Sequence, residues 1–327
     1  MLKRDAAFIG AIAAPAVFFF YVISSVAVNI PIGDGFDTVL GFLNSFISTG
    51  DTLEKARLVF EQHNEHRLAF NRLVTLIQYY LAGEADLRAL IIFGNLSVAG
   101  IAVLLILIFR ERLERALYLL PASLIIFNFQ YYETINWAMA SVSNLYVLFF
   151  AFLSLYLLLA RASFASFAGA IVCYAAAAFS QGGGLFAGLA GLAMLALSSE
   201  YKRAVVWGLF TLILFALYFY GYRSPEGHPS VFAVLSARTL LPIRFFFSFL
   251  GSLLPMPELF GLISFGFFIY LTIRRYYREN RAVYAFLLFL FITAAVTSVT
   301  RSGFGLDQSL ASRYRVVPAL IFGLHYL

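Results

Sequence analysis

Long apolar runs, rather than alternating apolar and polar positions, dominate the pattern along this chain. A helix that crosses a bilayer needs about 20 mostly apolar residues, and runs near that length recur throughout the sequence. Continuous runs predict helices and argue against a β-barrel, whose strands alternate. We expect spans at 7–28, 89–109, 113–129, 142–160, 163–180, 183–198, 204–222, 258–273 and 282–299.

Two further apolar stretches do not have the pattern of ordinary spans. Residues 316–327 are too few to cross, so we expect that the sequence stops within a helix or that this helix enters the bilayer without leaving it; we favour the first. With this run, the sequence predicts an all-α bundle of about ten spans, a single transmembrane domain over residues 1–327. The stretch 231–255 is expected to be re-entrant or interfacial, because it contains Arg238, Pro242, Arg244 and Gly251.

The segment between the first two spans, residues 29–88, has a helical pattern of its own. Its second amphipathic stretch covers 67–82 and is followed by Gly83. Helices of this kind lie in the plane of the membrane interface, so we expect a platform of juxtamembrane helices beside the end of the first span. The first stretch ends near Gly50, with Asp51 or Thr52 as the cap of a following helix, and its apolar face comprises Phe36, Val39, Leu40, Leu43 and Ile47.

Composition and charge support the membrane class. Apolar residues of the set AVILMFWYC make up 62% of the 327 residues and charged residues 12%, whereas a soluble domain has about 25% charged residues. The net charge of +6 does not indicate a nucleic-acid partner, because the basic residues lie between apolar runs, as topology requires. A single cysteine excludes a disulfide scaffold.

The distribution of basic residues predicts the orientation of the chain. Lys3 and Arg4 precede the first span and place the N-terminus in the cytoplasm. Alternation then puts the loop 29–88 outside. We expect an integral protein of a bacterial inner membrane, with cytoplasmic clusters at Arg110, Arg112, Arg115, Arg161, Lys202, Arg203, Arg274, Arg275, Arg278 and Arg281.

Polar residues gather in a few clusters on the predicted outer side. A protein with only structural needs has less reason for this concentration, so we expect a functional site there. The clusters contain Gly33 to Asp37, Glu61 to Arg67, Glu133, Asn136, Trp137, Ser180 to Gly184, Arg301, Asp307, Gln308 and Ser312 to Arg315.

This layout resembles the GT-C superfamily of membrane glycosyltransferases, which includes protein mannosyltransferases and aminoarabinose transferases. The shared features are a cytoplasmic N-terminus, a long first outer loop with two juxtamembrane helices, and an acidic motif after the first span, here Asp34-Gly35-Phe36-Asp37. The segment QHNEHRLAFNRL, residues 62–73, and the stretch ASRY, residues 311–314, resemble patterns in uncharacterised bacterial members. The resemblance implies transfer of a sugar from a polyprenyl-phosphate donor to a hydroxyl of a lipid, glycan or protein on the outer face.

Two aspartates are candidate catalytic residues under this resemblance. Inverting transfer needs a carboxylate within hydrogen-bond reach of the acceptor hydroxyl, and the resemblance implies this role for Asp34 or Asp37. Family members often carry two adjacent acidic residues here, whereas Gly35 and Phe36 separate these two, so the choice between them stays open. The alternative is that one of them caps the helix that begins near Phe36.

Basic and polar side chains are candidates for binding the substrate. A lipid phosphate needs cationic donors, which Arg301, Arg313 and Arg315 supply, although contact with anionic lipid headgroups is an alternative. Glu65, His66 and Arg67 are candidates for hydrogen bonds to the sugar, with a structural network as the alternative. A divalent metal near the two histidines of this segment is left open, since His63 and His66 share a face if the segment is helical; we assign no metal ligand and no cofactor.

Three other classes of function remain as alternatives: a transporter or flippase, a lipid-polymer ligase, and a non-catalytic scaffold. A transporter needs ionisable residues near the middle of its spans. The predicted spans contain Asn95, Asn128 and Asn144 but no charged residue near a centre, which favours the transferase.

Overall fold

The computed structural model describes residues 2–109, 119–160, 163–227, 229–230, 234, 236 and 240–327. Over these residues the chain is almost entirely helical, and the only sheet is a two-stranded hairpin. The all-α prediction is therefore confirmed. In chain order the bundle helices are α1 Leu2–Val26, α5 Leu87–Phe109, α6 Leu120–Ile126, α7 Tyr132–Asn136, α8 Ala138–Ala140, α9 Tyr146–Leu159, α10 Phe164–Ser180, α11 Phe186–Leu197, α12 Tyr201–Phe219, α14 Leu240–Leu250, α15 Pro257–Ile273, α16 Arg281–Arg301 and α17 Val316–Tyr326.

Helices of two other kinds complete the bundle. The π-helix η3 Ser141–Leu145 joins α8 to α9, so that Ala138–Leu159 runs on as one helix. Short 3₁₀ helices lie in the connections, at η4 Gly182–Leu185, η5 Tyr276–Arg278, η6 Ser302–Phe304, η7 Leu306–Leu310 and η8 Ser312–Tyr314.

Four of the described helices are long and apolar enough to cross a membrane: Leu87–Phe109, Ala138–Leu159, Tyr201–Phe219 and Arg281–Phe304. Six shorter apolar helices of 10–17 residues accompany them. This set fits an integral membrane protein, while the expected count of about ten spans is not confirmed. The 11-residue α14 rises about 16 Å, about half of the roughly 30 Å hydrocarbon core.

The structure corrects the span predicted at 113–129. Residues 113–118 lie outside the described residues, and α6 contains only the seven residues Leu120–Ile126. Asn128 explains the early end of this helix, because its amide donates to the carbonyl of Ile125 and its Oδ1 accepts from the backbone N–H of Gln130 at 2.8 Å. The polar residue of the predicted span therefore forms a turn instead of entering the bilayer.

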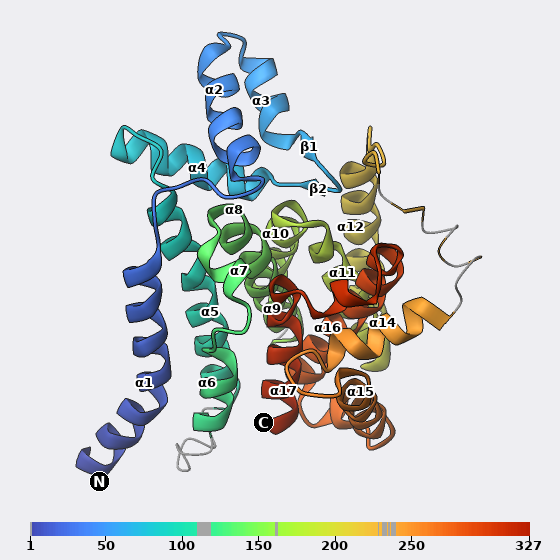
Figure 1. Ribbon diagram of the computed structural model, residues 1–327. Helices are drawn as coiled ribbons and strands as arrows, with labels where there is room; N and C mark the ends of the chain where they lie inside the picture. The colour runs from blue at the N-terminus through green and yellow to red at the C-terminus, as the bar shows by residue number, and fades with distance from the viewer. Residues whose placement is uncertain are drawn as a thin grey trace.

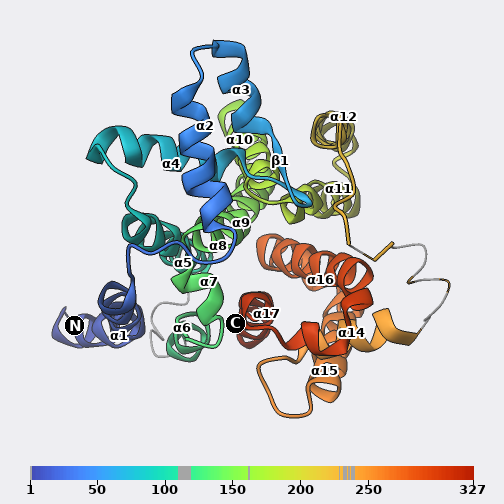
Figure 2. The ribbon, with the colours of Figure 1, turned by 45° about the horizontal axis from the view of Figure 1, so that its top comes forward.

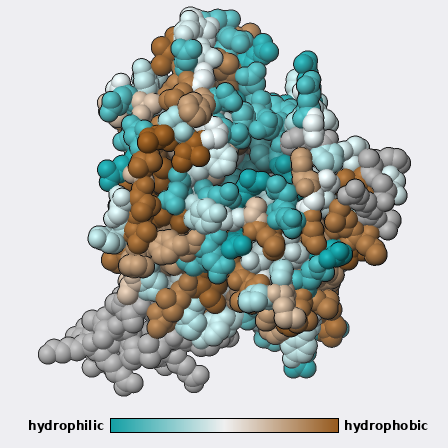
Figure 3. Space-filling view, in the orientation of Figure 1, coloured by the Kyte–Doolittle hydropathy of each residue, from teal (hydrophilic) through white to brown (hydrophobic). Residues whose placement is uncertain are grey.

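The exterior of the bundle is apolar where a soluble protein would be polar. On α12 a continuous outer face exposes Val205, Leu209, Leu212, Ile213 and Leu217. Exposed apolar patches of this size mark contact with another apolar phase, and lipid tails supply it here. Hydrophobic residues likewise cover much of one flank of the molecule, while hydrophilic residues gather over the upper half of the view in Figure 3.

The predicted platform caps one end of the bundle (Figures 1 and 2). It consists of the π-helix η1 Phe36–Gly41, α2 Phe42–Ser48, α3 Thr52–Phe60 and α4 Ala69–Ala82. Asp51 caps α3 by accepting from the N–H of Leu53 at 2.9 Å, and Gly83 ends α4 at φ +80°. Helices are present in both predicted stretches, although the first begins as a π-helix and the second begins at Ala69, because Arg67 belongs to a strand.

The faces of the platform helices differ from those of helices on a soluble protein. Within the first helix Val39 and Leu43 are buried, but Phe36 and Ile47 are exposed. The apolar side of α4 points outward, with Leu73, Ile77 and Leu81 exposed, while its buried side contains Asn71, Arg72 and Thr75. An outward apolar face suits a helix that lies in the lipid interface.

Ion pairs hold together the opposite end of the bundle. The carboxylate of Glu200, before α12, pairs with Arg203 and with Arg281, the latter at 2.5 Å. The basic loops 202–203 and 274–281, predicted to share a compartment, therefore lie at one end of the molecule; Arg110, Arg112, Arg115 and Arg161 lie outside the described residues. Partial burial acts to raise the pKa of Glu200, but the two arginines outweigh it and hold this pKa below its ordinary value of 4.5.

The Glu200 cluster predicts a pH-dependent stability. Because the pKa of Glu200 is lower in the folded protein, its contribution is fully present above pH 4.5 and is lost as the pH falls through the folded pKa. We expect Glu200→Gln to lower the free energy of unfolding by about 2 kcal/mol at neutral pH. Denaturant unfolding of the detergent-solubilised protein at pH 7 and near pH 3.5 measures both effects.

A matched control is Glu54→Gln, which breaks the exposed 3.5 Å pair with Arg57 and should cost less than about 1 kcal/mol. A difference between wild type and Glu200→Gln that stayed constant down to about pH 3 would contradict the assignment.

Candidate functional site

The candidate site is built on the β-hairpin between α3 and α4. Strand β1, Gln62–His63, pairs antiparallel with β2, His66–Arg67. The two-residue turn is formed by Asn64, at φ +48°, and Glu65; asparagine is one of the few residues that adopt this conformation readily. The helical spacing considered for His63 and His66 is therefore wrong, because they are partners across the hairpin.

Two arginines attach the hairpin to its surroundings through backbone carbonyls. Arg67 donates from Nε to the carbonyl of Tyr218 at 2.6 Å, from Nη1 to that of Phe60 at 2.7 Å, and from Nη2 to that of Tyr220. The buried Arg72 donates to the carbonyls of Leu58 and Glu61, each at 2.6 Å. Burial lowers the pKa of Arg72, and the charge of Glu61 opposes this shift.

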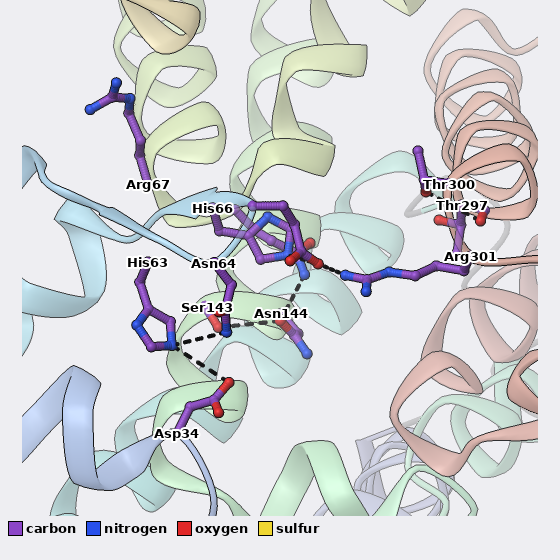
Figure 4. A network of polar contacts seen from close by, with 12 residues as sticks. Asp34, His63, Asn64, His66, Arg67, Ser143, Asn144, Thr297, Thr300 and Arg301 are labelled. Atoms are coloured by element: carbon purple, nitrogen blue, oxygen red, sulfur yellow. Dashed lines mark hydrogen bonds and ion pairs between the residues drawn. The ribbon is translucent and has the colours of Figure 1, made fainter. Parts of the chain in front are cut away.

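Arg67, predicted to bind substrate, thus uses its guanidinium to join the hairpin to the end of α12. In Figure 4 its side chain extends away from the other labelled residues of the network. Its charge is shared with three carbonyl dipoles, so its contacts are those of a residue that positions the hairpin.

Tyr218 completes the attachment from the side of α12. Its hydroxyl donates to the carbonyl of Glu65 at 3.2 Å and accepts from the N–H of Arg67 at 3.2 Å. A Cβ atom at Gly182 would lie 2.7 Å from this hydroxyl and 3.4 Å from Nδ1 of His66. Glycine is therefore required at 182 for the 3₁₀ turn to approach the hairpin this closely.

The hairpin tip connects two pairs of ionisable side chains (Figure 4). On one side Nε2 of His63 lies 3.6 Å from Oδ2 of Asp34 and 3.3 Å from the amide of Asn64. On the other side Oε1 of Glu65 lies 3.5 Å from Nε2 of His66 and forms an ion pair with Arg301, at the end of α16. An acidic motif after α1 and a cation from the last span therefore meet the same hairpin.

A cavity of about 560 Å³ opens beside this ion pair. Glu65, His66 and Arg301 line it together with Gln181, whose amide donates to Oδ1 of Asn144 at 2.9 Å. Its other polar walls come from α12, α16 and the segments beside them, namely Tyr218, Tyr222, Ser224, Ser230, Thr293, Thr297, Thr300 and Tyr314. The lining thus combines a cation, a carboxylate, an imidazole and several hydroxyls, which suits a charged, hydroxyl-rich ligand.

The predicted aspartates occupy different positions. Asp34 is partly exposed beside His63, and its backbone carbonyl accepts from the N–H of Thr38 at 2.8 Å. Asp37 lies exposed in the first turn of η1. Neither side chain caps this helix, because its cap residue is Gly35 and no side-chain cap bond is formed there.

The late arginines separate in the same way. Arg313 donates from its backbone N–H to Oε2 of Glu133 at 3.0 Å and from Nη2 to Gln308 at 2.9 Å. Arg315 donates to the carbonyl of Leu310 at 3.2 Å and to Gln130 at 3.4 Å. Only Arg301 of the three predicted phosphate ligands is among the residues that line the cavity.

Sequence reasoning missed the hydroxyl wall of the cavity. Thr293, Thr297, Thr300 and Arg301 are spaced i, i+4, i+7 and i+8, which places them on one face of α16. A polar stripe on an otherwise apolar span was the signal that could have identified this wall. Asn144, noted only as a polar residue within a span, is the partner that orients Gln181.

Searches of protein-family models, curated proteins and solved structures find no match for this chain. Within the described residues, no group of three or more His, Cys, Asp or Glu side chains is arranged to hold a metal ion. The geometry of the cavity and the hairpin is therefore the basis for assigning a function.

The attachment of the hairpin gives a test that does not depend on activity. Arg67→Met removes three donors to carbonyls, and we expect a loss of about 2–3 kcal/mol of stability with faster hydrogen exchange at residues 62–67. Arg57→Met, which removes an exposed guanidinium from the same platform, is the control and should change stability by less than about 1 kcal/mol. Unchanged exchange in Arg67→Met would show that these bonds do not hold the hairpin.

Proposed function

We propose that this protein is a membrane glycosyltransferase that moves a sugar from a polyprenyl-phosphate donor to a hydroxyl of a lipid, glycan or protein. The observation that carries the proposal is that one hairpin brings a carboxylate–imidazole pair and a carboxylate–arginine pair to the same end of the bundle. His63 and Glu65 are two residues apart, so their Cα atoms lie at most about 7 Å from each other.

Arg301 is the proposed ligand of the donor phosphate. A guanidinium binds phosphate oxygens through two parallel N–H donors, and Arg301 presents its charge at the cavity wall. Glu65 balances this charge, so a phosphate that enters the cavity takes the place of the carboxylate as partner of Arg301. The released Glu65 and the neighbouring His66 are then available to the sugar hydroxyls.

Asp34 is the proposed general base. A base must lie within hydrogen-bond reach of the hydroxyl it deprotonates, and the partly exposed carboxylate of Asp34 is held by His63 at the hairpin. As the acceptor oxygen forms its bond to the anomeric carbon, its proton passes to Asp34 and the bond to the phosphate oxygen breaks. Asp37, exposed in the first turn of η1 three residues later, has no comparable connection to the hairpin among the described residues.

The position of the site suits a lipid-linked donor. The outward Leu73, Ile77 and Leu81 of α4 are consistent with a platform at the lipid interface, and a polyprenyl chain dissolved in the bilayer would present its phosphate at that level. We propose that this level is the outer face of a bacterial inner membrane, in accord with the basic residues at the opposite end.

The transporter alternative receives no support from the described spans. Charged residues in the four long helices, such as Arg88, Lys202 and Arg301, lie within the first or last turns. A transport path needs ionisable groups near the middle of the membrane. In these four helices the charged groups lie instead at the two ends.

Substitution of the two aspartates tests the base. We expect Asp34→Asn to lower turnover by about 10²–10⁴-fold, while Asp37→Asn, the matched control three residues away, retains nearly full turnover. The measurement is release of polyprenyl phosphate from a panel of polyprenyl-phosphate sugars by the protein in nanodiscs. Equal losses in both variants, or none in Asp34→Asn, would remove Asp34 from the chemistry.

Binding of polyprenyl phosphate tests the cation separately. We expect Arg301→Gln to weaken binding at least tenfold, since a hydrogen bond to a charged group contributes about 1.5–3 kcal/mol, and Arg315→Gln, the control, to leave it unchanged. Glu65→Gln frees Arg301 from its carboxylate partner and should strengthen binding. If Arg301→Gln bound polyprenyl phosphate as wild type does, the phosphate assignment would be wrong.

A further inference from the structure

A second cavity, of about 730 Å³, lies between α10 and α12 at the end of the bundle opposite the platform. Its walls are apolar side chains from both helices, including Phe167, Ile171, Val206 and Phe210. Residues 164–172 of α10 rise about 12 Å along the groove. One leaflet of the hydrocarbon core is about 15 Å thick, so the groove matches the depth of a single leaflet.

The mouth of this groove is cationic. Lys202 and Arg203 line it at the first turn of α12, and Arg203 also lies over the ring of Phe167, 5.7 Å from its centre. Arg203 shares the carboxylate of Glu200 with Arg281, so this cluster of three cations and one carboxylate keeps a formal charge of about +2. Lys202 is exposed and has no carboxylate partner in the described part of the chain.

We propose that this groove binds one anionic glycerophospholipid, with its phosphate at Lys202 and Arg203 and one acyl chain between α10 and α12. The charge of the mouth complements a phosphodiester that carries a net negative charge, and the apolar walls complement the chain attached to it. A free phosphate would leave the walls unused, and a zwitterionic lipid would place a second cation beside Lys202. This site lies at the far end of the molecule from the cavity at Arg301 and does not depend on the proposed transferase activity.

The lipid would add to the contacts between α10 and α12, where Arg203 and Trp207 already pack against Phe167. Its chain would fill the space between α10 and α12, and its phosphate would sit next to the Glu200 cluster, which joins the start of α12 to the start of α16. A bound anionic lipid should therefore stabilise the packing of α12, the helix that holds the hairpin at its other end.

Native mass spectrometry of the full chain tests the proposal. The protein is released from micelles that contain equal amounts of dioleoyl-phosphatidylglycerol and dioleoyl-phosphatidylcholine. We expect one phosphatidylglycerol to be retained in preference, and Lys202→Ala to reduce that preference about fivefold, as expected for one basic residue near an anionic headgroup. Lys55→Ala is the control, because Lys55 is a lysine of the platform, on α3.

A substitution that fills the groove tests the apolar walls independently of the cationic mouth. Val206→Trp places a large ring in the groove and should abolish retention of phosphatidylglycerol, while Val205→Trp, on the neighbouring outward face, should retain it. Thermal unfolding of both variants shows that they are folded. The proposal would be overturned if wild type retained the two lipids equally, or if Lys202→Ala kept the same preference. It would also be overturned if folded Val206→Trp retained phosphatidylglycerol, or if equimolar polyprenyl phosphate displaced phosphatidylglycerol.

Discussion

The arrangement of the site depends on the hydrogen bonds between the hairpin 62–67 and the end of α12. Two hydrogen bonds join Arg67 to Tyr218 across a sequence separation of about 150 residues, and the hydroxyl of Tyr218 also donates to the carbonyl of Glu65. Only with the hairpin in this place can Glu65 reach Arg301 and His63 reach Asp34. Residues from the first, middle and last thirds of the chain therefore meet through one short segment.

The bundle supports this hairpin with apolar helices whose charged residues lie near the helix ends. Carboxylates and cations are concentrated at the hairpin and at the Glu200 cluster, and the helices between these two ends are apolar outside and closely packed inside. At Gly94 an added Cβ would lie 2.4 Å from the hydroxyl of Ser141, which shows how closely α5 approaches η3. The helix α11 packs against both α12 and α16, and the ends of these two helices reach the hairpin and the Glu200 cluster.

Periodicity and charge predicted the helical class, the two amphipathic platform helices and the common end of the basic loops. They did not predict the length of the helix in 113–129. Hydropathy does not show that the side chain of Asn128 forms hydrogen bonds with the backbone of Ile125 and Gln130 in a turn. The number of spans also could not be read reliably, since α10 and α15 have 17 residues each and α14 only 11.

For the site, the sequence identified the segments but not the role of each side chain. Charged residues in the outer loops looked alike as candidates, yet Arg67, Arg313 and Arg315 donate to backbone carbonyls and neutral side chains, whereas Arg301 faces a carboxylate. The partners of Arg67 and Arg301 come from distant parts of the chain, whereas Gln308 and Leu310 lie five residues before Arg313 and Arg315. A pattern along one sequence contains no information on pairings between distant residues. The role of each side chain within a cluster can therefore be assigned only from the three-dimensional structure.

The outward apolar face of α4 ties the height of the site to the surrounding lipid. Leu73, Ile77 and Leu81 are exposed, as expected of a helix in the lipid interface. The buried Arg72 on the opposite side of the same helix donates to the backbone of α3 and of the residue leading into the hairpin. A change in leaflet thickness would therefore press on the helix and, through it, on the contact between Glu65 and Arg301. The thickness of the bilayer would in this way influence the geometry of the pocket.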